Sequence, residues 1–286
     1  MSLIVPERLA ENCRKSPETM AWLERLPGVL ADLERRWAVT LGPPYDGPEV
    51  SASWVAPVLR ADATSAVVKV GLPHMEAEHE IDGLRFWDGD PTVRLFEADD
   101  ALGAMLLERC EPGTALRSLP EPEQDVVIAG LLRRLWRVPS APHPFRPLSE
   151  MIGSWIGETM ANEPRWSDPG LVRDGLRVFD NLLRDPTDDH VLLSTDLHAG
   201  NVLRSQRARW LVIDVMPFVG DRAYDATQHL LNCEARMRDD PHGTVARFAD
   251  LLDVDAERVR SWLFARISAE SGGDWEPWAD LARVLA

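Results

Sequence analysis

The chain has 286 residues, of which 45% are hydrophobic and 27% are charged, as in a globular protein with one or two domains. Its formal net charge of −16 argues against nucleic acid or an anionic membrane surface as a partner. A cationic ligand would be attracted by this charge, although acidity that serves only solubility would give the same composition.

Other features of the composition exclude further classes of protein. No apolar run approaches the roughly 20 residues that span a bilayer, and the first residues lack the basic start and apolar core of a secretory signal. The cysteines, Cys13, Cys110 and Cys233, show no paired or metal-binding spacing, and neither do the histidines. These features favour a cytoplasmic protein with reduced thiols.

The N-terminal part of the chain is predicted to be helical. Apolar residues recur at helical spacing over residues 6–39, and Ser16-Pro17-Glu18 marks the start of the second of two helices. Gly42-Pro43-Pro44 ends this region with a turn. These helices carry no candidate for chemistry, so we expect them to serve packing.

Residues 50–72 predict a β-hairpin, in which SASWVAPVLR and TSAVVKVGL flank a short turn. Lys69 lies in the second strand, between apolar neighbours. A lysine in a strand most often occupies a solvated edge position, but Lys15 and Lys69 are the only lysines among 31 basic residues. In a chain that otherwise uses arginine, a lysine within an apolar strand indicates that an ammonium group is needed there.

The next elements are a helix and two strands. The helix is predicted from Met75 to about Trp87 and carries three acids that are candidate partners for Lys69, namely Glu76, Glu78 and Glu80. The strands are predicted at residues 93–97 and 104–107. Beyond them, helices are predicted at residues 123–138, 148–162, 169–185 and 223–238, with two or three more within residues 241–286.

The stretch of residues 191–218, VLLSTDLHAGNVLRSQRARWLVIDVMPF, carries the clearest chemical signal. Two apolar runs each lead to an acid, Asp196 and Asp214, and Asn201 lies between them. One carboxylate can accept a hydroxyl proton, while an amide and a second carboxylate hold Mg2+ against the phosphates of a nucleotide, and this is the order of these parts in a kinase. The alternative is a β-hairpin whose Asp and Asn residues cap turns. His198 is interpreted as a loop-packing residue, because imidazole is a poor Mg2+ ligand.

The segments DLHAGNVL, WLVID and PFVGDRAYD resemble the catalytic region of the aminoglycoside phosphotransferase family of small-molecule kinases, in particular its streptomycin 6-phosphotransferase and hydroxyurea phosphotransferase branch. The resemblance extends from about Val50 to about Asn232. It departs at Ser194-Thr195, where the family usually has His-Gly, and at Val215-Met216-Pro217, where the branch often has Pro-Lys-Pro. Neither departure removes a charged group.

The resemblance implies an α+β, two-lobed protein-kinase-like fold. Residues 1–109 would form a small nucleotide-binding lobe with a mostly antiparallel sheet, and residues 110–286 would form a larger helical lobe for catalysis and substrate binding. ATP would bind with Mg2+ in the cleft between these lobes.

The resemblance also implies roles for single residues of the helical lobe. Asp196 is the expected catalytic base, and Asn201 and Asp214 are the expected Mg2+ ligands. Asp225 most resembles the acid that braces the catalytic loop through backbone N–H groups.

The nucleotide is expected to contact the smaller lobe and the segment that follows it. The residues expected there are Lys69, Glu80, Ser51, Ser53, Glu108 and Cys110. Lys69, held by Glu80, would bind the α- and β-phosphates. The two serines would let the backbone approach the phosphates, and the main chain from Glu108 to Cys110 would meet the adenine edge.

The expected substrate is a small hydroxylated molecule, by resemblance a cationic aminoglycoside such as streptomycin, whose guanidinium groups would pair with carboxylates. The candidate carboxylates are Asp221, Glu234, Asp239, Asp274 and Glu276. Two alternatives stay open: a kinase of hydroxyurea or another small metabolite, and a catalytically dead kinase-like module that binds nucleotide. No oligomeric state is predicted.

Overall fold

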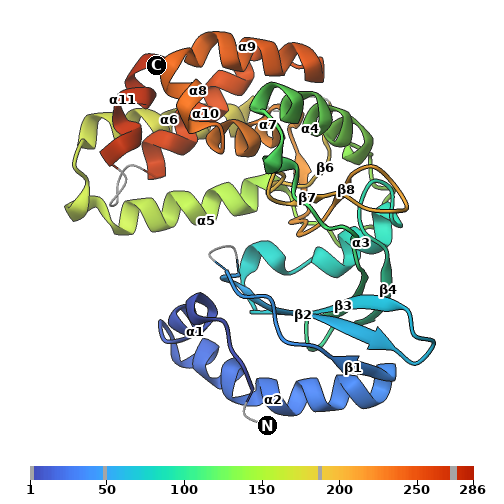
Figure 1. Ribbon diagram of the computed structural model, residues 1–286. Coiled ribbons are helices and arrows are strands. Elements are labelled where there is room, and N and C mark those ends of the chain that lie inside the picture. The colour runs from blue at the N-terminus through green and yellow to red at the C-terminus, as the bar shows by residue number, and fades with distance from the viewer. Residues whose placement is uncertain (1–2, 48–49, 186–188, 271–275) are drawn as a thin grey trace. The chain divides into compact units, whose positions relative to one another are not determined.

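The computed structural model describes residues 3–47, 50–185, 189–270 and 276–286, apart from the side chains of residues 270, 276 and 277. The chain forms two compact units, one from residues 1–114 with 204–213 and the other from residues 115–203 with 214–286. The first unit contains the main β-sheet, and the second unit is mostly helical (Figure 1).

A five-stranded antiparallel sheet forms the centre of the first unit, with the strand order β1-β2-β3-β5-β4. Its strands are β1 (Val39–Leu41), β2 (Ser53–Arg60), β3 (Ser65–Gly71), β4 (Leu95–Asp99) and β5 (Ala104–Glu108). The predicted hairpin is confirmed as β2 and β3, and the two further predicted strands are present as β4 and β5. β3 is the middle strand, so Lys69 lies between Val55 on β2 and Met105 on β5.

Alternation along β3 separates the two faces of this sheet. Ala66, Val68 and Val70 are buried in a hydrophobic core with residues of α1 (Glu7–Cys13) and α2 (Pro17–Trp37). In Figure 1, α2 runs along this face of the sheet. Because successive side chains of a strand point to opposite faces, Lys69 faces away from α2 and meets α3 (Glu80–Trp87) on the other side.

The caps of α2 explain where this helix begins and ends. The side chain of Ser16 accepts a hydrogen bond from the backbone N–H of Thr19 (3.2 Å), and Pro17 occupies the first turn. Ala38 then adopts a left-handed conformation (φ 50°), which turns the chain into β1. The predicted helical region extended to residue 39, whereas the helix ends at Trp37 and residues 39–41 form a three-residue strand that was not predicted.

Eight helices make up most of the described part of the second unit. They are α4 (Glu121–Leu135), α5 (Leu148–Ala161), α6 (Pro169–Arg184), α7 (Arg222–Leu231), α8 (Glu234–Asp239), α9 (Pro241–Leu252), α10 (Ala256–Glu270) and α11 (Glu276–Leu285). α10 packs against α6, α7, α9 and α11. Its Trp262 is buried, with ring centroids 5.3 Å from Tyr224 and 6.1 Å from Phe179. In the described part of the chain, no helix combines the length and the apolar character needed to cross a membrane.

Two predicted helices differ from the structure at their ends. The predicted helix at residues 223–238 is divided into α7 and α8, because Asn232 and Cys233 donate to carbonyls only three residues back (3.0 and 2.9 Å), which ends α7. In the predicted helix from Met75, only Glu80–Trp87 is α-helical, after a single 3-10 turn.

Short strands flank the predicted catalytic residues. β6 (Val191–Leu193) precedes Asp196 and pairs antiparallel with β9 (Phe218–Gly220), so it does not form a hairpin with the run that leads to Asp214. β7 (Val202–Leu203) follows Asn201. β8 (Leu211–Val212) belongs to the first unit, where Val212 hydrogen-bonds with Pro91 and Val93 (3.1 and 3.0 Å).

Candidate active site

Lys69 and Glu80 form a buried ion pair in the first unit. The ammonium nitrogen of Lys69 lies 2.6 and 2.7 Å from the two carboxylate oxygens of Glu80. The residues are only 8% and 4% exposed, so water screens the pair little. The expected pairing is confirmed, and it fixes the ammonium group of the central strand against the first turn of α3.

The two serines expected near the phosphates lie at the start of the hairpin. The main-chain oxygen of Ser51 accepts a hydrogen bond from the side chain of Asn12 (2.8 Å). Ser53 is the first residue of β2 and pairs with Gly71. Both serines are partly exposed.

Glu108 and Cys110 lie at and just beyond the end of β5. The backbone N–H of Glu108 donates to the carbonyl of Arg94 (2.8 Å), and its carboxylate accepts hydrogen bonds from Arg207 (2.8–3.1 Å). Burial alone would raise the pKa of Glu108, but Arg207 lowers it below the ordinary value. For Cys110, burial and the nearby Glu108 raise the thiol pKa to about 11. The backbone N–H of Glu108 is thus already bonded to Arg94, the residue before β4.

Asp196 is held by two amide side chains of the second unit. Its Oδ1 accepts a hydrogen bond from Nε2 of Gln228 (2.6 Å), and its Oδ2 accepts one from Nδ2 of Asn201 (3.0 Å). Asn201 also donates to the main-chain oxygen of Asp196 (3.0 Å). Because the amide nitrogen of Asn201 faces Asp196, its carbonyl oxygen is directed elsewhere and is an acceptor for a cation.

The charges around Asp196 fit a divalent cation. Burial raises the pKa of Asp196 to about 7, repulsion from Asp214 adds to the rise, and Arg266, Asn201 and Gln228 oppose it. A cation held by Asp214 would relieve the repulsion between the two carboxylates. Carboxylate and amide oxygens are also the ligands that Mg2+ prefers. Asn201 and Asp214 therefore suit the metal predicted for them.

Asp225 braces the loop that carries Asp196, as expected. Its carboxylate is fully buried and accepts hydrogen bonds from the backbone N–H groups of Ser194 (3.1 Å) and Thr195 (2.7 Å) and from the indole of Trp136 (3.0 Å). Burial raises the pKa of Asp225 to about 6 although these donors favour the ionised form. The acid lies in the first turn of α7, which thereby fixes the loop backbone just before Asp196.

Thr195 connects this loop with the segment after Asp214. Its hydroxyl donates to the carbonyl of Met216 (2.6 Å), and the N–H of Met216 donates to the carbonyl of Ser194 (3.0 Å). Thr195 has a φ of 46°, a left-handed conformation that β-branched residues rarely adopt. The two places where the sequence departs from the usual family pattern therefore contact each other.

The roles of three residues of this site, Gln228, Arg266 and Thr195, were not predicted from the sequence. Gln228 follows Asp225 by three positions on α7, so the two residues lie on the same face of the helix. This spacing is the feature of the sequence that could have indicated a role for Gln228. Arg266, on α10, donates to the side-chain oxygens of Gln228 (2.8 Å) and Thr227 (2.6 Å). His198, as predicted, packs within its loop, where its Nδ1 accepts from the N–H of Gly200 (3.0 Å).

Asp221, one of the carboxylates expected to bind substrate, is engaged inside the second unit. It is 6% exposed and caps α7 by accepting from the N–H of Ala223 (2.9 Å). Its other oxygen accepts hydrogen bonds from Arg258 (2.5 Å) and from the indole of Trp262 (2.7 Å). These contacts give Asp221 a structural role.

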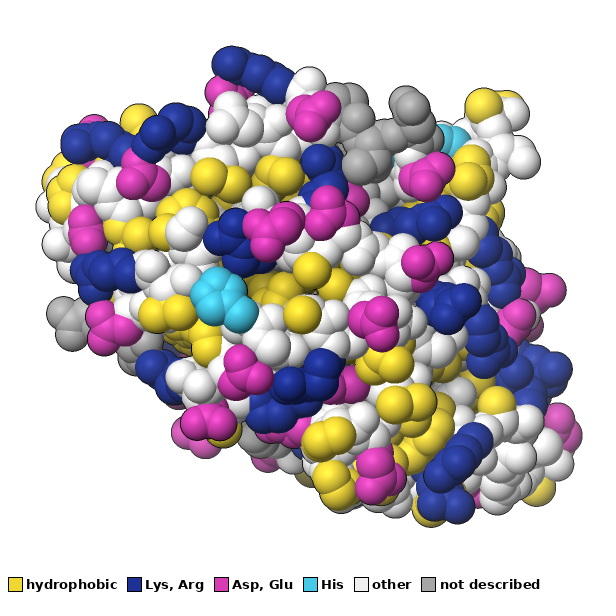
Figure 2. Space-filling model, turned by 90° about the horizontal axis from the view of Figure 1, so that it is seen from above, with side chains coloured by type: hydrophobic (Ala, Val, Ile, Leu, Met, Phe, Trp, Pro, Cys, Tyr) yellow, Lys and Arg dark blue, Asp and Glu magenta, His cyan; other side chains and the backbone are white. Residues whose placement is uncertain are grey.

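The other carboxylates expected to bind substrate differ in how well they are described. Glu234 is exposed and pairs with Arg238 on α8 (2.9 Å), and Asp239 is exposed at the end of that helix. Asp274 and the side chain of Glu276 lie outside the described residues. On the face shown in Figure 2, acidic and basic side chains are interspersed, so the net negative charge is not concentrated there.

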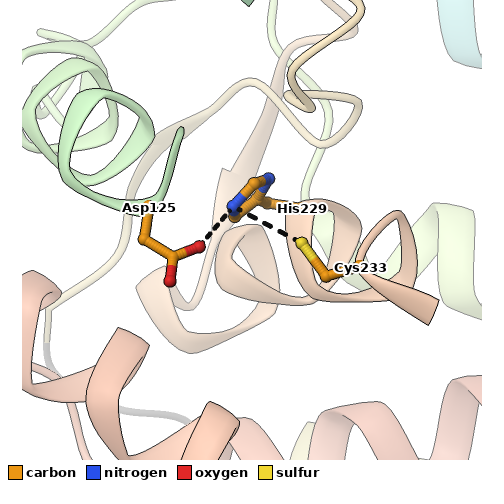
Figure 3. A group of neighbouring side chains, drawn as sticks. All are labelled: Asp125, His229 and Cys233. Carbon is orange, nitrogen blue, oxygen red and sulfur yellow. Dashed lines mark hydrogen bonds and ion pairs between the residues drawn. The ribbon is translucent and has the colours of Figure 1, made fainter. Parts of the chain in front are cut away.

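A second group of potential metal ligands lies in the second unit. Asp125 of α4, His229 of α7 and Cys233 point toward one another (Figure 3), and their ligand atoms lie within 4.8 Å of one another. The histidine spacing in the sequence did not indicate this cluster. Arg236 donates two hydrogen bonds to Asp125 (2.7 and 2.8 Å) and one to the sulfur of Cys233 (3.3 Å). The guanidinium group of Arg236 thus supplies the positive charge that a metal ion would otherwise bring to these ligands. The cluster is therefore a structural ion-pair network.

Residues 36–277 match the family described as aminoglycoside/hydroxyurea antibiotic resistance kinase. A streptomycin 6-kinase from Streptomyces glaucescens is 35% identical over 277 residues, which cover 92% of this chain and 88% of that protein. A hydroxyurea phosphotransferase from Kitasatospora aureofaciens is 36% identical over 257 residues, which cover 86% of this chain and 72% of that protein.

Solved structures share the fold at low sequence identity. A choline kinase, LicA from Streptococcus pneumoniae, is similar with a TM-score of 0.63 and 15% identity, over 92% of this chain and 97% of that chain. The likeness confirms the expected α+β, protein-kinase-like fold.

Proposed function

The chain belongs to the aminoglycoside/hydroxyurea antibiotic resistance kinase family, and from this premise we propose that it transfers the γ-phosphoryl group of ATP to a hydroxyl group of streptomycin or a similar aminoglycoside. The observation that carries the proposal is the arrangement around Asp196. Its carboxylate accepts hydrogen bonds from two neutral amide groups, and the negative charge of Asp214 is close enough to raise its pKa. One acid is thus available as a base, and the other, with Asn201, as a cation ligand.

In the proposed reaction, Asp196 orients the substrate hydroxyl and accepts its proton. The hydroxyl oxygen forms a bond to the γ-phosphorus, the bond from that phosphorus to the bridging oxygen breaks, and ADP leaves with the electron pair. Mg2+ supplies positive charge to the phosphates when bound. Asn201 and Asp214 hold it through their oxygen atoms, and Asp225 keeps the backbone before Asp196 fixed during transfer.

On the nucleotide side, we assign residues 1–109 to nucleotide binding and residues 110–286 to catalysis and substrate binding. Lys69 binds the α- and β-phosphates, and Glu80 holds it in place. Ser51 and Ser53, as small residues, let the backbone approach the phosphates. The N–H of Glu108 already donates to the carbonyl of Arg94. The main chain near Cys110 therefore forms the hydrogen bond with adenine.

The substrate proposal is supported by the streptomycin 6-kinase relative and by the net charge of −16, which attracts a cationic antibiotic. Streptomycin carries guanidinium groups, which pair well with carboxylates. Glu234 and Asp239 are exposed and are retained as candidates, together with Asp274 and Glu276, whereas Asp221 already serves α7 and Arg258. We place the protein in the cytoplasm, where ATP is available and where free thiols such as those of its three cysteines stay reduced.

A second candidate substrate is hydroxyurea, which is favoured by the hydroxyurea phosphotransferase relative. A catalytically inactive nucleotide-binding module is the third reading. The intact Lys69–Glu80 pair and the braced Asp196 count against it, since an inactive module has no need to hold a base in place.

The test is a phosphotransfer assay with Mg-ATP and a panel of acceptors that includes streptomycin and hydroxyurea. The wild-type chain is expected to phosphorylate streptomycin, and Asp196→Asn is expected to abolish transfer while ATP still binds, as followed by thermal shift. Asn162→Asp, an exposed amide-to-acid change at the end of α5, is the matched control and should leave transfer unchanged. Transfer by Asp196→Asn at the wild-type rate would remove Asp196 from the mechanism.

A further inference from the structure

Both oxygens of Asp196 are engaged by side-chain amides, and the two amides have different further partners. Asn201 lies five residues after Asp196 in the same loop and also bonds to its main chain. Gln228 comes from α7 and reaches Oδ1 from outside the loop, at 2.6 Å. Each carboxylate oxygen can accept two hydrogen bonds, so a substrate hydroxyl can still donate to Asp196 while both amides stay in place.

The direction of the Gln228 amide is fixed by Arg266. A guanidinium group only donates hydrogen bonds, so the group of Gln228 that lies 2.8 Å from Arg266 must be its carbonyl oxygen. The NH2 group of Gln228 is therefore turned toward Asp196. A reversed amide would place an oxygen against the carboxylate and an NH2 group against the guanidinium, which is unfavourable at both ends.

Arg266 is itself held firmly in the second unit. It is 6% exposed, and its guanidinium carbon lies 5.4 Å from the ring centre of Trp155 and 5.2 Å from that of Tyr224. It also donates to the hydroxyl of Thr227 (2.6 Å). These contacts come from α5 and α7, so two helices besides α10, which carries Arg266, determine the position of the guanidinium group.

We propose that Gln228, oriented by Arg266, is a positioning residue that holds the carboxylate of Asp196 in the orientation in which it receives the substrate hydroxyl. This inference rests on the proposed phosphotransfer. α7 would then fix the base twice: Asp225 holds the loop backbone, and Gln228, three residues later, holds the side chain. Placing a neutral amide between Arg266 and Asp196 keeps the cation from pairing directly with the base, which would weaken it as a proton acceptor.

The test compares Gln228→Leu, which keeps the approximate size but removes the donor, with Gln228→Glu, which keeps the shape and can still accept from Arg266. Both are expected to lower kcat for streptomycin phosphorylation by about 10- to 100-fold, with the KM values for streptomycin and ATP within about twofold of wild type, because a misdirected base affects the transition state and not ground-state binding. The matched control is Asn232→Ala, which removes an exposed amide at the C-terminal end of α7 that donates to the main-chain oxygen of Gln228. This control should retain the wild-type kcat.

The role of Arg266 is tested by a double-mutant cycle. Arg266→Lys keeps the charge but cannot donate to Gln228 and Thr227 in the same fork geometry, so it should lower kcat by itself. In the Gln228→Leu background the same change should cause no further loss, because Arg266 then has no amide to orient. Additive losses would contradict an action of Arg266 through Gln228.

Crystal structures of the wild-type chain and Gln228→Leu separate this inference from the proposed function. The Asp196 carboxylate is expected to rotate away from its wild-type orientation in the variant. An unchanged carboxylate, or a kcat equal to that of the wild type, would overturn the positioning role. If the wild type phosphorylated none of the acceptors, the proposed function would fail, and the orientation of Asp196 in the two structures would still decide the positioning role.

Discussion

Thr195 holds a backbone conformation that its own side chain disfavours. Its φ of 46° costs a β-branched residue on the order of 1–2 kcal/mol. The hydrogen bond from its hydroxyl to Met216 offsets this cost and links the loop of Asp196 to the segment after Asp214. A glycine would adopt the same backbone without strain but would leave the two loops without this link.

We therefore expect Thr195→Val to destabilise the protein by about 1–2 kcal/mol, because it removes the hydroxyl and keeps the strain. Thr195→Gly should cost less, because it removes both. Ser194→Ala is the matched control: the hydroxyl of Ser194 is buried with no hydrogen-bond partner among the described residues, so its removal should leave stability unchanged or raise it. Urea unfolding measures all three, and a Val variant as stable as wild type would show that the bond to Met216 contributes nothing.

At the level of single residues, the sequence predicts which charged residues form the site, but it does not predict how their side chains are oriented. Lys69, Asp196 and Asp225 are predictable because each stands at a fixed place relative to a strand or a helix start. Gln228 and Arg266 are not, because an amide on a helix gains its role from a guanidinium group 38 residues away. The position of that partner is decided by the packing of α7 on α10, which no local pattern encodes.

The Lys69–Glu80 ion pair joins two elements, β3 and α3, at a buried place. Replacing Lys69 by Met leaves the carboxylate of Glu80 buried without its cation, and a loss of about 3–5 kcal/mol in the free energy of unfolding is expected. The double variant Lys69→Met/Glu80→Leu should recover much of this loss, since an apolar pair of similar size can pack there. Neither variant should phosphorylate streptomycin.

Denaturant unfolding and a phosphotransfer assay check this prediction together. Lys15→Met, on the segment between α1 and α2, is the control for loss of a lysine outside the sheet. Recovery of stability without activity would separate the structural role of the pair from its role toward the nucleotide. Full activity of the double variant would mean that Lys69 has no part in phosphate binding.

The network of Asp125, His229 and Arg236 ties α4 to α7 and α8, close to the break between the latter two helices. Burial alone would lower the pKa of His229, but the hydrogen bond with Asp125 raises it to about 9 from an ordinary 6.5. The folded protein thus holds this proton more tightly than the unfolded chain does. Its contribution to stability is complete below about pH 6.5 and is lost as the pH rises through about 9.

We expect the wild type to lose on the order of 2 kcal/mol more stability than His229→Gln between pH 6.5 and 9.5, because glutamine does not titrate. Urea unfolding at the two pH values gives this difference, and comparison with the variant cancels the other groups that titrate in this range. His242→Gln, an exposed histidine in the first turn of α9, is the control and should follow the wild type. Equal losses in wild type and His229→Gln would show that His229 is not charged in the folded state.

Long elements are more predictable than short ones for a physical reason. α6 and the β2–β3 hairpin repeat their apolar residues over several turns or alternations, and this pattern reports the buried face. β1 and β9 have three residues each, too few to show a period. Their formation depends on pairing with β2 and β6, whose proximity is a property of the whole unit.

At the scale of the whole molecule, the net charge of −16 predicts a salt effect on substrate binding. The screening length falls from about 10 Å at 0.1 M salt to about 3 Å at 1 M. The KM for streptomycin should therefore rise several-fold with salt at saturating ATP, while kcat stays nearly constant. Steady-state assays with a neutral acceptor such as hydroxyurea give the control, and an equal rise for both acceptors would argue against attraction of the cation by the protein.

The chain passes between its two compact units three times, because residues 204–213 return to the first unit. No fragment made by one cut contains a complete first unit without part of the second. Residues 1–114 alone lack Val212, so the carbonyl of Pro91 and the N–H of Val93 lose their partners and leave an open edge for other chains. Hybrids that exchange the first unit between relatives must therefore carry residues 204–213 along, and both junctions of that insert lie within three residues of Asn201 or Asp214.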